Sequence, residues 1–162
     1  MAKSKFPPRG WRNNNPLNIR RGKTKWVGEV DHLTLVLTDK MGNKTTTKEY
    51  DRSFCQFSEM AYGWRATFKI LKKYITEYKL NTISKIIGRW APPNENNTNT
   101  YIHHVSMCAG IDENEVVHIT DEDAMLGIVQ GMCTMENGMD YDPFLHKNTR
   151  QALYEGYRMA ID

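Results

Sequence analysis

The feature that most constrains the fold is a change of hydrophobic pattern near residue 58. Between residues 24 and 57, HLTLVLTD alternates apolar and polar residues, KMGNK supplies turn residues, and TTTKEY is rich in threonine. This pattern predicts two strands joined as a β-hairpin, because successive residues of a strand face opposite sides. After residue 58, apolar residues recur every three or four positions, which is the spacing of a helix packed against a core. The chain therefore predicts an α+β fold in which helices predominate.

The first predicted helix has the clearest pattern. SEMAYGWRATFKILKKYITEY begins at Ser58, a residue type that caps helices. Within it, Trp64, Phe68, Leu71 and Ile75 fall on one stripe. We expect this stripe to form part of the core.

Four more helices are predicted from their boundary residues. They are NTISKIIGRW, which ends at the prolines of APP; NENNTNTYIHHVSMCAG, which ends at Gly110; TDEDAMLGIVQGMCTMENG, which opens with a Thr120 and Asp123 pair resembling a capping box and runs to Gly138; and TRQALYEGYRMAI. The expected order is thus a short N-terminal segment, a hairpin and about five helices.

We interpret residues 1–162 as one domain with three parts: an asparagine-rich N-terminal segment (1–22), the hairpin region (24–57) and a helical part (58–162). No apolar run approaches the ~18 residues of a membrane-spanning helix, so no membrane insertion is expected. Basic residues open the chain, but no apolar segment follows them, so no secretory signal peptide is expected. The three cysteines have no CxxC spacing and are interpreted as reduced, buried thiols.

Charge alone does not select a partner. The net charge is +3, and seven Lys and Arg residues lie from Lys3 to Lys23, whereas acids concentrate later in the chain. Such a basic head suits nucleic acid, anionic lipid or an anionic cell-wall polymer, and it suits a solubilising surface equally well.

Motifs for metals and nucleophiles are missing from the sequence. His103 and His104 are adjacent, so on a helix they point about 100° apart and do not share one metal. No HExxH, GxSxG or glycine-rich phosphate loop is present. We expect no metal and no organic cofactor.

Amides and aromatic residues gather in two segments, RGWRNNNPLNIRRG and WAPPNENNTNTY. Sugar rings stack on aromatic faces, while their hydroxyl and N-acetyl groups need amides and carboxylates; the same residues also make ordinary turns, caps and core. Asn15 and Asn18 flank Pro16, which makes them the more structural members of the first segment. The candidate sugar-binding residues are Asn14, Asn15, Asn18, Arg20, Trp26, Trp90, Glu95, Asn96 and Tyr101.

Three acids are candidates for chemistry. Glu136 lies near the end of an apolar helix among several methionines, where partial desolvation would raise its pKa and suit it to donate a proton. The alternative is a solvated residue in a C-terminal turn. Glu49, in the second predicted strand, and Asp51, two residues later on the same side, could supply the second carboxylate of a glycoside hydrolase, or be ordinary surface acids. WVGEVD also offers Glu29 and Asp31.

The motifs RNNNPLNIRRG…KWVG, SFCQFSEMAYGWRATFKILKKY and TISKIIGRWAPPNENNTNTYIHHV resemble a family of bacteriophage and prophage cell-wall lytic proteins. The resemblance runs from Arg12 to Gly110 and implies a lysozyme-like muramidase or transglycosylase domain, in a family whose members are sometimes virion structural proteins. Related glucosaminidases and phage lysozymes carry a helix with a catalytic glutamate directly before a segment similar to NNNPLNIR. No helical pattern precedes Asn13 here, but GIVQGMCTMENG is similar to that helix. The resemblance thus implies a circularly permuted order with Glu136 as proton donor.

The expected function is cleavage of the peptidoglycan glycan strand, of muramidase, glucosaminidase or lytic transglycosylase type. The resemblance of TxEY to a hairpin motif of the glucosaminidases makes Glu49 the first choice of second acid, with Asp51 its rival. Arg20 could meet a muramyl or peptide-stem carboxylate. The implied protein is a monomer made in the bacterial cytoplasm, with glycan strands and no nucleic acid as partners, acting on the wall after holin release or from the virion. The alternative is a non-catalytic wall-binding or virion structural protein on the same scaffold.

Overall fold

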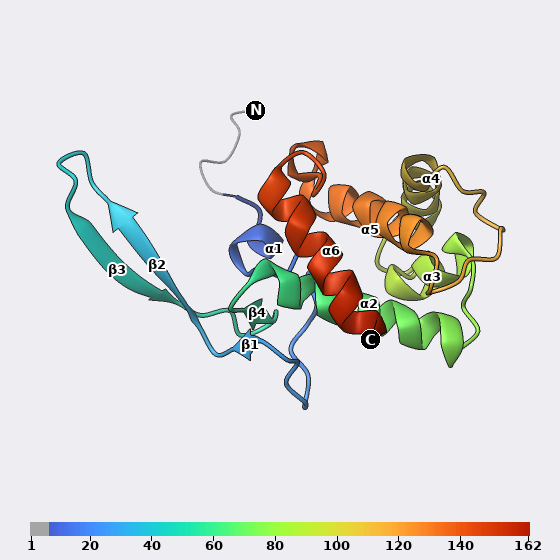
Figure 1. The fold of residues 1–162 in the computed structure, drawn as a ribbon, viewed down its shortest axis with the longest axis horizontal. Helices are drawn as coiled ribbons and strands as arrows, with labels where there is room; N and C mark the ends of the chain where they lie inside the picture. The colour runs from blue at the N-terminus through green and yellow to red at the C-terminus, as the bar shows by residue number, and fades with distance from the viewer. Residues whose placement is uncertain (1–6) are drawn as a thin grey trace.

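The computed structural model describes residues 7–162, so Lys3 and Lys5 of the predicted basic head lie outside the described residues. The fold is mainly helical α+β, as predicted, with two small antiparallel sheets (Figure 1). The helices are α1 (Arg9–Arg12), α2 (Met60–Thr76), α3 (Ile83–Trp90), α4 (Thr98–Ala109), α5 (Glu122–Asn137) and α6 (Lys147–Ile161), with a 3₁₀ turn η1 (Met139–Tyr141). The strands are β1 (Glu29–Val30), β2 (Leu33–Thr38), β3 (Lys44–Glu49) and β4 (Gln56–Phe57).

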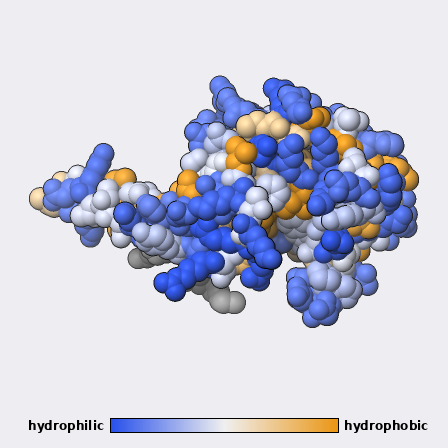
Figure 2. All heavy atoms as spheres, turned by 90° about the horizontal axis from the view of Figure 1, so that it is seen from below, coloured by the Kyte–Doolittle hydropathy of each residue, from blue (hydrophilic) through white to orange (hydrophobic). Residues whose placement is uncertain are grey.

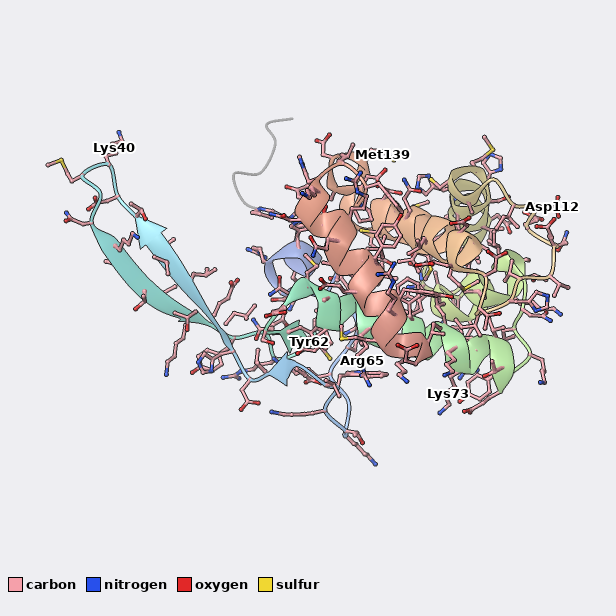
Figure 3. All side chains as sticks on the ribbon, viewed as in Figure 1. Lys40, Tyr62, Arg65, Lys73, Asp112 and Met139 are labelled. Carbon is pink, nitrogen blue, oxygen red and sulfur yellow. The ribbon has the colours of Figure 1, made fainter. Side chains whose placement is uncertain are left out.

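The predicted hairpin is confirmed by β2 and β3, which pair from Leu33 opposite Glu49 to Thr38 opposite Lys44. Its turn is held by the Asp39 carboxylate, which accepts hydrogen bonds from two backbone N–H groups of the turn. The hairpin projects from the helices as an arm (Figures 1 and 2), with Lys40 at its tip (Figure 3). At its base, β1 pairs with β4 and connects the arm to the start of α2.

Helix α2 lies at the centre of the helical part. The predicted stripe of Trp64, Phe68, Leu71 and Ile75 is buried, which confirms the expectation from spacing. Helix α6 packs against α2 at Gly156, where an added Cβ would lie 2.3 Å from the Trp64 Cβ atom. The two helices can approach this closely only because Gly156 has no side chain.

Helix boundaries differ from the predictions at three places. The N-cap of α2 is Glu59 rather than Ser58, and its side chain makes no capping hydrogen bond. The N-cap of α5 is Asp121, whose carboxylate accepts from the Ala124 N–H, so the predicted Thr120 pairing is wrong. The one-turn helix α1 precedes Asn13, where no helix was predicted, because four residues are too few to show a period.

The core has two parts. The larger is formed by the inner faces of α2 to α6, and the smaller by Ile19, Cys55, Phe57 and Ala66 beside the hairpin base. Cys55 and Cys133 are buried free thiols, while Cys108 is half-buried. Within residues 7–162, no helix combines the length and apolar character needed to cross a bilayer.

Candidate active site

The asparagine-rich segment is a loop held by its own amides. Asn14 and Asn18 have φ values of 52° and 53°, in the left-handed region that asparagine tolerates better than most residues. The Asn15 side chain is buried; it accepts from the Ile19 N–H (2.9 Å) and donates to the Cys55 carbonyl (3.0 Å). Asn15 therefore has the structural role that its position beside proline indicated.

This loop rests against α2 and the hairpin base. The Asn14 amide donates to the Phe57 carbonyl at 2.9 Å. A Cβ atom on Gly63 of α2 would lie 2.0 Å from the Asn14 carbonyl oxygen, so the loop requires glycine at that position. The amides of Asn14 and Asn15 are thus engaged by the protein backbone.

The C-terminal end of α5 meets the same loop, which confirms the proximity predicted for these two distant segments. The Asn137 amide donates to the Pro16 carbonyl at 2.7 Å, which fastens the helix end to the loop. One residue earlier, a Glu136 carboxyl oxygen lies 3.5 Å from the Asn18 amide nitrogen. Helix α1 fits alongside because Gly10 has no side chain; a Cβ there would lie 3.0 Å from Asn137 Oδ1.

A cavity of about 410 Å³ opens where these elements meet. Its lining residues come from the loop, the segment before β4, α2, α3 and α5: Leu17, Asn18, Ile19, Arg20, Phe54, Ile70, Tyr74, Trp90 and Glu136. The lining contains three aromatic rings (Phe54, Tyr74 and Trp90), one amide (Asn18), one cation (Arg20) and one carboxyl group (Glu136). This composition suits a ligand with apolar faces and polar edges, such as a sugar.

Glu136 is the acid of this cavity. Desolvation by the surrounding protein atoms raises its pKa, and hydrogen bonds from Tyr101, Asn18 and Trp90 oppose that shift without cancelling it. The side chain is nevertheless open to solvent through the cavity, so a ligand can reach it. A ligand in the cavity can therefore reach Glu136, and Glu136 keeps its proton to higher pH than an ordinary glutamate does.

Tyr101 fixes the orientation of this carboxyl group. Its hydroxyl donates to Glu136 Oε1 at 3.2 Å and lies 3.5 Å from the Met132 carbonyl. The ring is buried, and burial is the main cause that raises the pKa of Tyr101, so the hydroxyl remains a donor.

Asp51 is in a different environment and does not line the cavity. Its carboxylate accepts from Arg9 Nε (2.5 Å), from the Asn13 amide (2.8 Å) and from the backbone N–H groups of Ser53 and Phe54 (3.0 Å each). Burial raises the pKa of Asp51, but these hydrogen bonds outweigh it and hold the pKa well below its ordinary value. The geometry gives Asp51 a structural role, in which it joins α1 to the segment before β4.

Glu49 lies at the end of β3, opposite Leu33, and does not line the cavity either. It is half-buried, and its Oε2 atom has no hydrogen-bond partner among the described residues. Neither candidate for the second acid is therefore brought beside Glu136.

The remaining candidates divide into two groups. Arg20 and Trp90 line the cavity, and the Arg20 guanidinium lies 4.9 Å from the centre of the Phe54 ring. Trp26 packs instead against the smaller core cluster. Glu95 and Asn96 are exposed in the turn after α3 and are not among the lining residues.

The cavity also uses residues that the sequence interpretation did not select, chiefly Phe54, Ile70 and Tyr74. Ile70 and Tyr74 are one helical turn apart on α2 and lie off the predicted core stripe. Two apolar residues four positions apart on a second face of the helix are a sequence signal that could have identified this part of the cavity lining. Within residues 7–162, no group of three or more His, Cys, Asp or Glu is placed to hold a metal ion.

Comparison with known proteins shows similarity to a phage protein. Over 152 residues the chain is 32% identical to Protein P5 of Pseudoalteromonas phage PM2, and the aligned region covers 92% of this chain and 82% of that protein. No family model matches the chain.

Proposed function

The chain belongs to the family of Protein P5 of Pseudoalteromonas phage PM2, and from this premise we propose that it is a phage or prophage lytic protein that cleaves the glycan strand of peptidoglycan. The observation that carries the proposal is Glu136: an accessible carboxyl group with a raised pKa in a cavity walled by aromatic rings. The arrangement of α5 against the asparagine-rich loop also supports the lysozyme-like, circularly permuted order implied by the sequence motifs.

In the proposed reaction, Glu136 donates its proton to the glycosidic oxygen as the bond from that oxygen to the anomeric carbon breaks. Tyr101 and Asn18 hold the carboxyl group in place through their hydrogen bonds. The Trp90 and Tyr74 rings offer faces on which sugar rings can stack, and Arg20 offers a charge for a muramyl or stem carboxylate.

The second half of the reaction depends on what attacks the anomeric carbon. Most glycoside hydrolases use a second carboxylate close to the first. Glu49 and Asp51 do not line this cavity, so the geometry favours attack by the sugar's own C6 hydroxyl. Its oxygen would bond to the anomeric carbon and its proton would pass to the Glu136 carboxylate, which gives an anhydro sugar and restores the acid.

We also propose a partner, an oligomeric state and a place of action. The partner would be the glycan strand rather than nucleic acid, the protein would act as a monomer without a cofactor, and it would reach the wall after holin release or from the virion. The other candidate is a wall-binding or virion structural protein, favoured by the lack of a second acid among the residues that line the cavity.

The test is digestion of purified Gram-negative sacculi and Gram-positive walls, with mass spectrometry of the soluble fragments. We expect the wild-type protein to release fragments with anhydro ends and Glu136→Gln to release none. Glu115→Gln is the matched control, because Glu115 is exposed, lies outside the cavity lining and is not among the candidate site residues. Reducing ends would indicate hydrolysis and a second acid. Binding to walls without release of fragments, unchanged by Glu136→Gln, would select the non-catalytic alternative.

A further inference from the structure

Aromatic rings continue beyond the cavity from Tyr74. The Tyr74 ring centre lies 6.4 Å from that of Trp90, which also lines the cavity, and 6.3 Å from that of Tyr78, which does not. Tyr78 is 42% exposed, two residues after the end of α2. The row Trp90, Tyr74 and Tyr78 therefore leads from the cavity wall to the open surface.

Arg89 covers the outer part of this row. Its guanidinium carbon lies 4.5 Å from the centre of the Tyr78 ring and 5.4 Å from that of Tyr74. Contact with two ring faces and a hydrogen bond to Tyr74 restrict the guanidinium before any ligand arrives. A guanidinium carries five N–H donors, so others remain for a ligand. The group is thus preorganised for a planar anion.

Arg89 differs from two other arginines of the chain in its ion pairing. Arg9 pairs with Asp51 and Arg21 pairs with Glu29, but no carboxylate within residues 7–162 pairs with Arg89. The same is true of Arg20, which lies over Phe54 on another part of the cavity wall.

Helix α2 supplies a second cation to this surface. Lys73 lies at the outer end of the helix (Figure 3), with its ammonium group 5.7 Å from the centre of the Tyr78 ring. The Arg89 guanidinium carbon lies 4.5 Å from the same ring centre. Two cations beside one ring favour an anionic partner.

We infer that Arg89, supported by Tyr74, Tyr78 and Lys73, forms a carboxylate-binding subsite beside the cavity. The identity of the ligand rests on the proposed function: peptidoglycan carries carboxylates on the lactyl group of muramic acid, where no peptide is attached, and on the peptide stem. A guanidinium can bind either group through two parallel N–H···O bonds. The subsite would distinguish peptidoglycan from a neutral N-acetylglucosamine polymer.

The test is isothermal titration calorimetry with three probes: a neutral chitin oligomer, a glycan fragment with free lactyl carboxylates and no peptide, and a free stem peptide without sugar. The proteins are the wild type, Arg89→Gln and Arg150→Gln. Arg150 is the matched control, because it is an exposed arginine on α6, outside the cavity lining and without an ion pair among the described residues.

We expect Arg89→Gln to weaken binding of an acidic probe by about tenfold, the typical value of a lost charge-assisted hydrogen bond, and to leave chitin binding unchanged. Arg150→Gln should change neither. Weakening of the lactyl glycan would identify the lactyl carboxylate as the ligand, and weakening of the peptide would identify the stem.

The possible results bear differently on the subsite and on the proposed function. Equal effects of Arg89→Gln on chitin and on the acidic probes, or no effect on either acidic probe, would overturn the subsite. Arg89-dependent binding of the stem peptide, without binding of either glycan, would keep the subsite and contradict glycan cleavage. Failure of all three probes to bind the wild type would overturn both.

Discussion

Two carboxyl groups, Asp51 and Glu136, accept hydrogen bonds from the same asparagine-rich loop, and their pKa values shift in opposite directions. Asp51 is buried, but the hydrogen bonds from Arg9, Asn13 and two backbone N–H groups hold it ionised. Glu136 is open to the cavity and receives longer bonds, from Tyr101 at 3.2 Å and Asn18 at 3.5 Å. Desolvation therefore raises the pKa of Glu136.

The difference shows that burial alone does not identify a functional acid. The more buried carboxylate here is the structural one, because its donors outweigh desolvation. The more accessible one retains the property that proton donation requires. The comparison predicts that substitutions of the first should affect stability, and those of the second activity.

The largest expected effect is on activity. Glu136→Gln keeps the shape of the side chain but removes its transferable proton, so the rate of wall clearing should fall by at least about a hundredfold. Turbidity of a sacculus suspension measures the rate, and circular dichroism checks that the variant is folded. Clearing at the wild-type rate would remove Glu136 from the mechanism.

The second effect is on stability. Asp51→Asn should lower the free energy of unfolding by about 2 kcal/mol, with allowance for the exposure of Arg9. Because its folded pKa is lowered, Asp51 contributes above an unfolded pKa of about 3.9, and the contribution is lost as the pH falls through the folded pKa. Urea unfolding at neutral and acidic pH measures both effects. An unchanged stability at neutral pH, or a loss of activity in the folded variant, would contradict the structural role.

Tyr101→Phe should give a smaller change. It removes a hydrogen bond that lowers the pKa of Glu136, so that pKa should rise and the alkaline limb of the pH–rate profile should move to higher pH. The activity at the optimum should change by less than about tenfold. A shift to lower pH would be inconsistent with this hydrogen bond.

The smallest effect is again on stability. Since the folded pKa of Glu136 is raised, its ionisation destabilises the fold as the pH rises from the unfolded value of about 4.3 through the folded pKa. Glu136→Gln cannot ionise, so it should be slightly more stable than the wild type at neutral pH and equally stable below that window. Melting temperatures across pH 3–8 test this. A variant less stable at neutral pH would show that the carboxylate supports the fold.

The sequence predicted the regular elements better than the site. The hairpin alternation and the Trp64 to Ile75 stripe depend on local periodicity, and both are confirmed. The contact between α5 and the asparagine-rich loop was also anticipated, but from motif resemblance rather than from any local pattern. The separation of Asp51 from the cavity depends on its ion pair with Arg9, 42 residues away, which no local pattern contains. Tyr74 was missed because it lies on a second face of a helix selected only for its core stripe.

The most direct test of the central claim is a carbon-13 NMR titration that follows both side-chain carboxyl groups in the wild-type protein, with Glu136→Gln and Asp51→Asn to assign the signals. We expect Glu136 to titrate above the ordinary glutamate value of about 4.3 and Asp51 below the ordinary aspartate value of about 3.9. Glu136 titrating at or below its ordinary value would contradict its assignment as the proton donor.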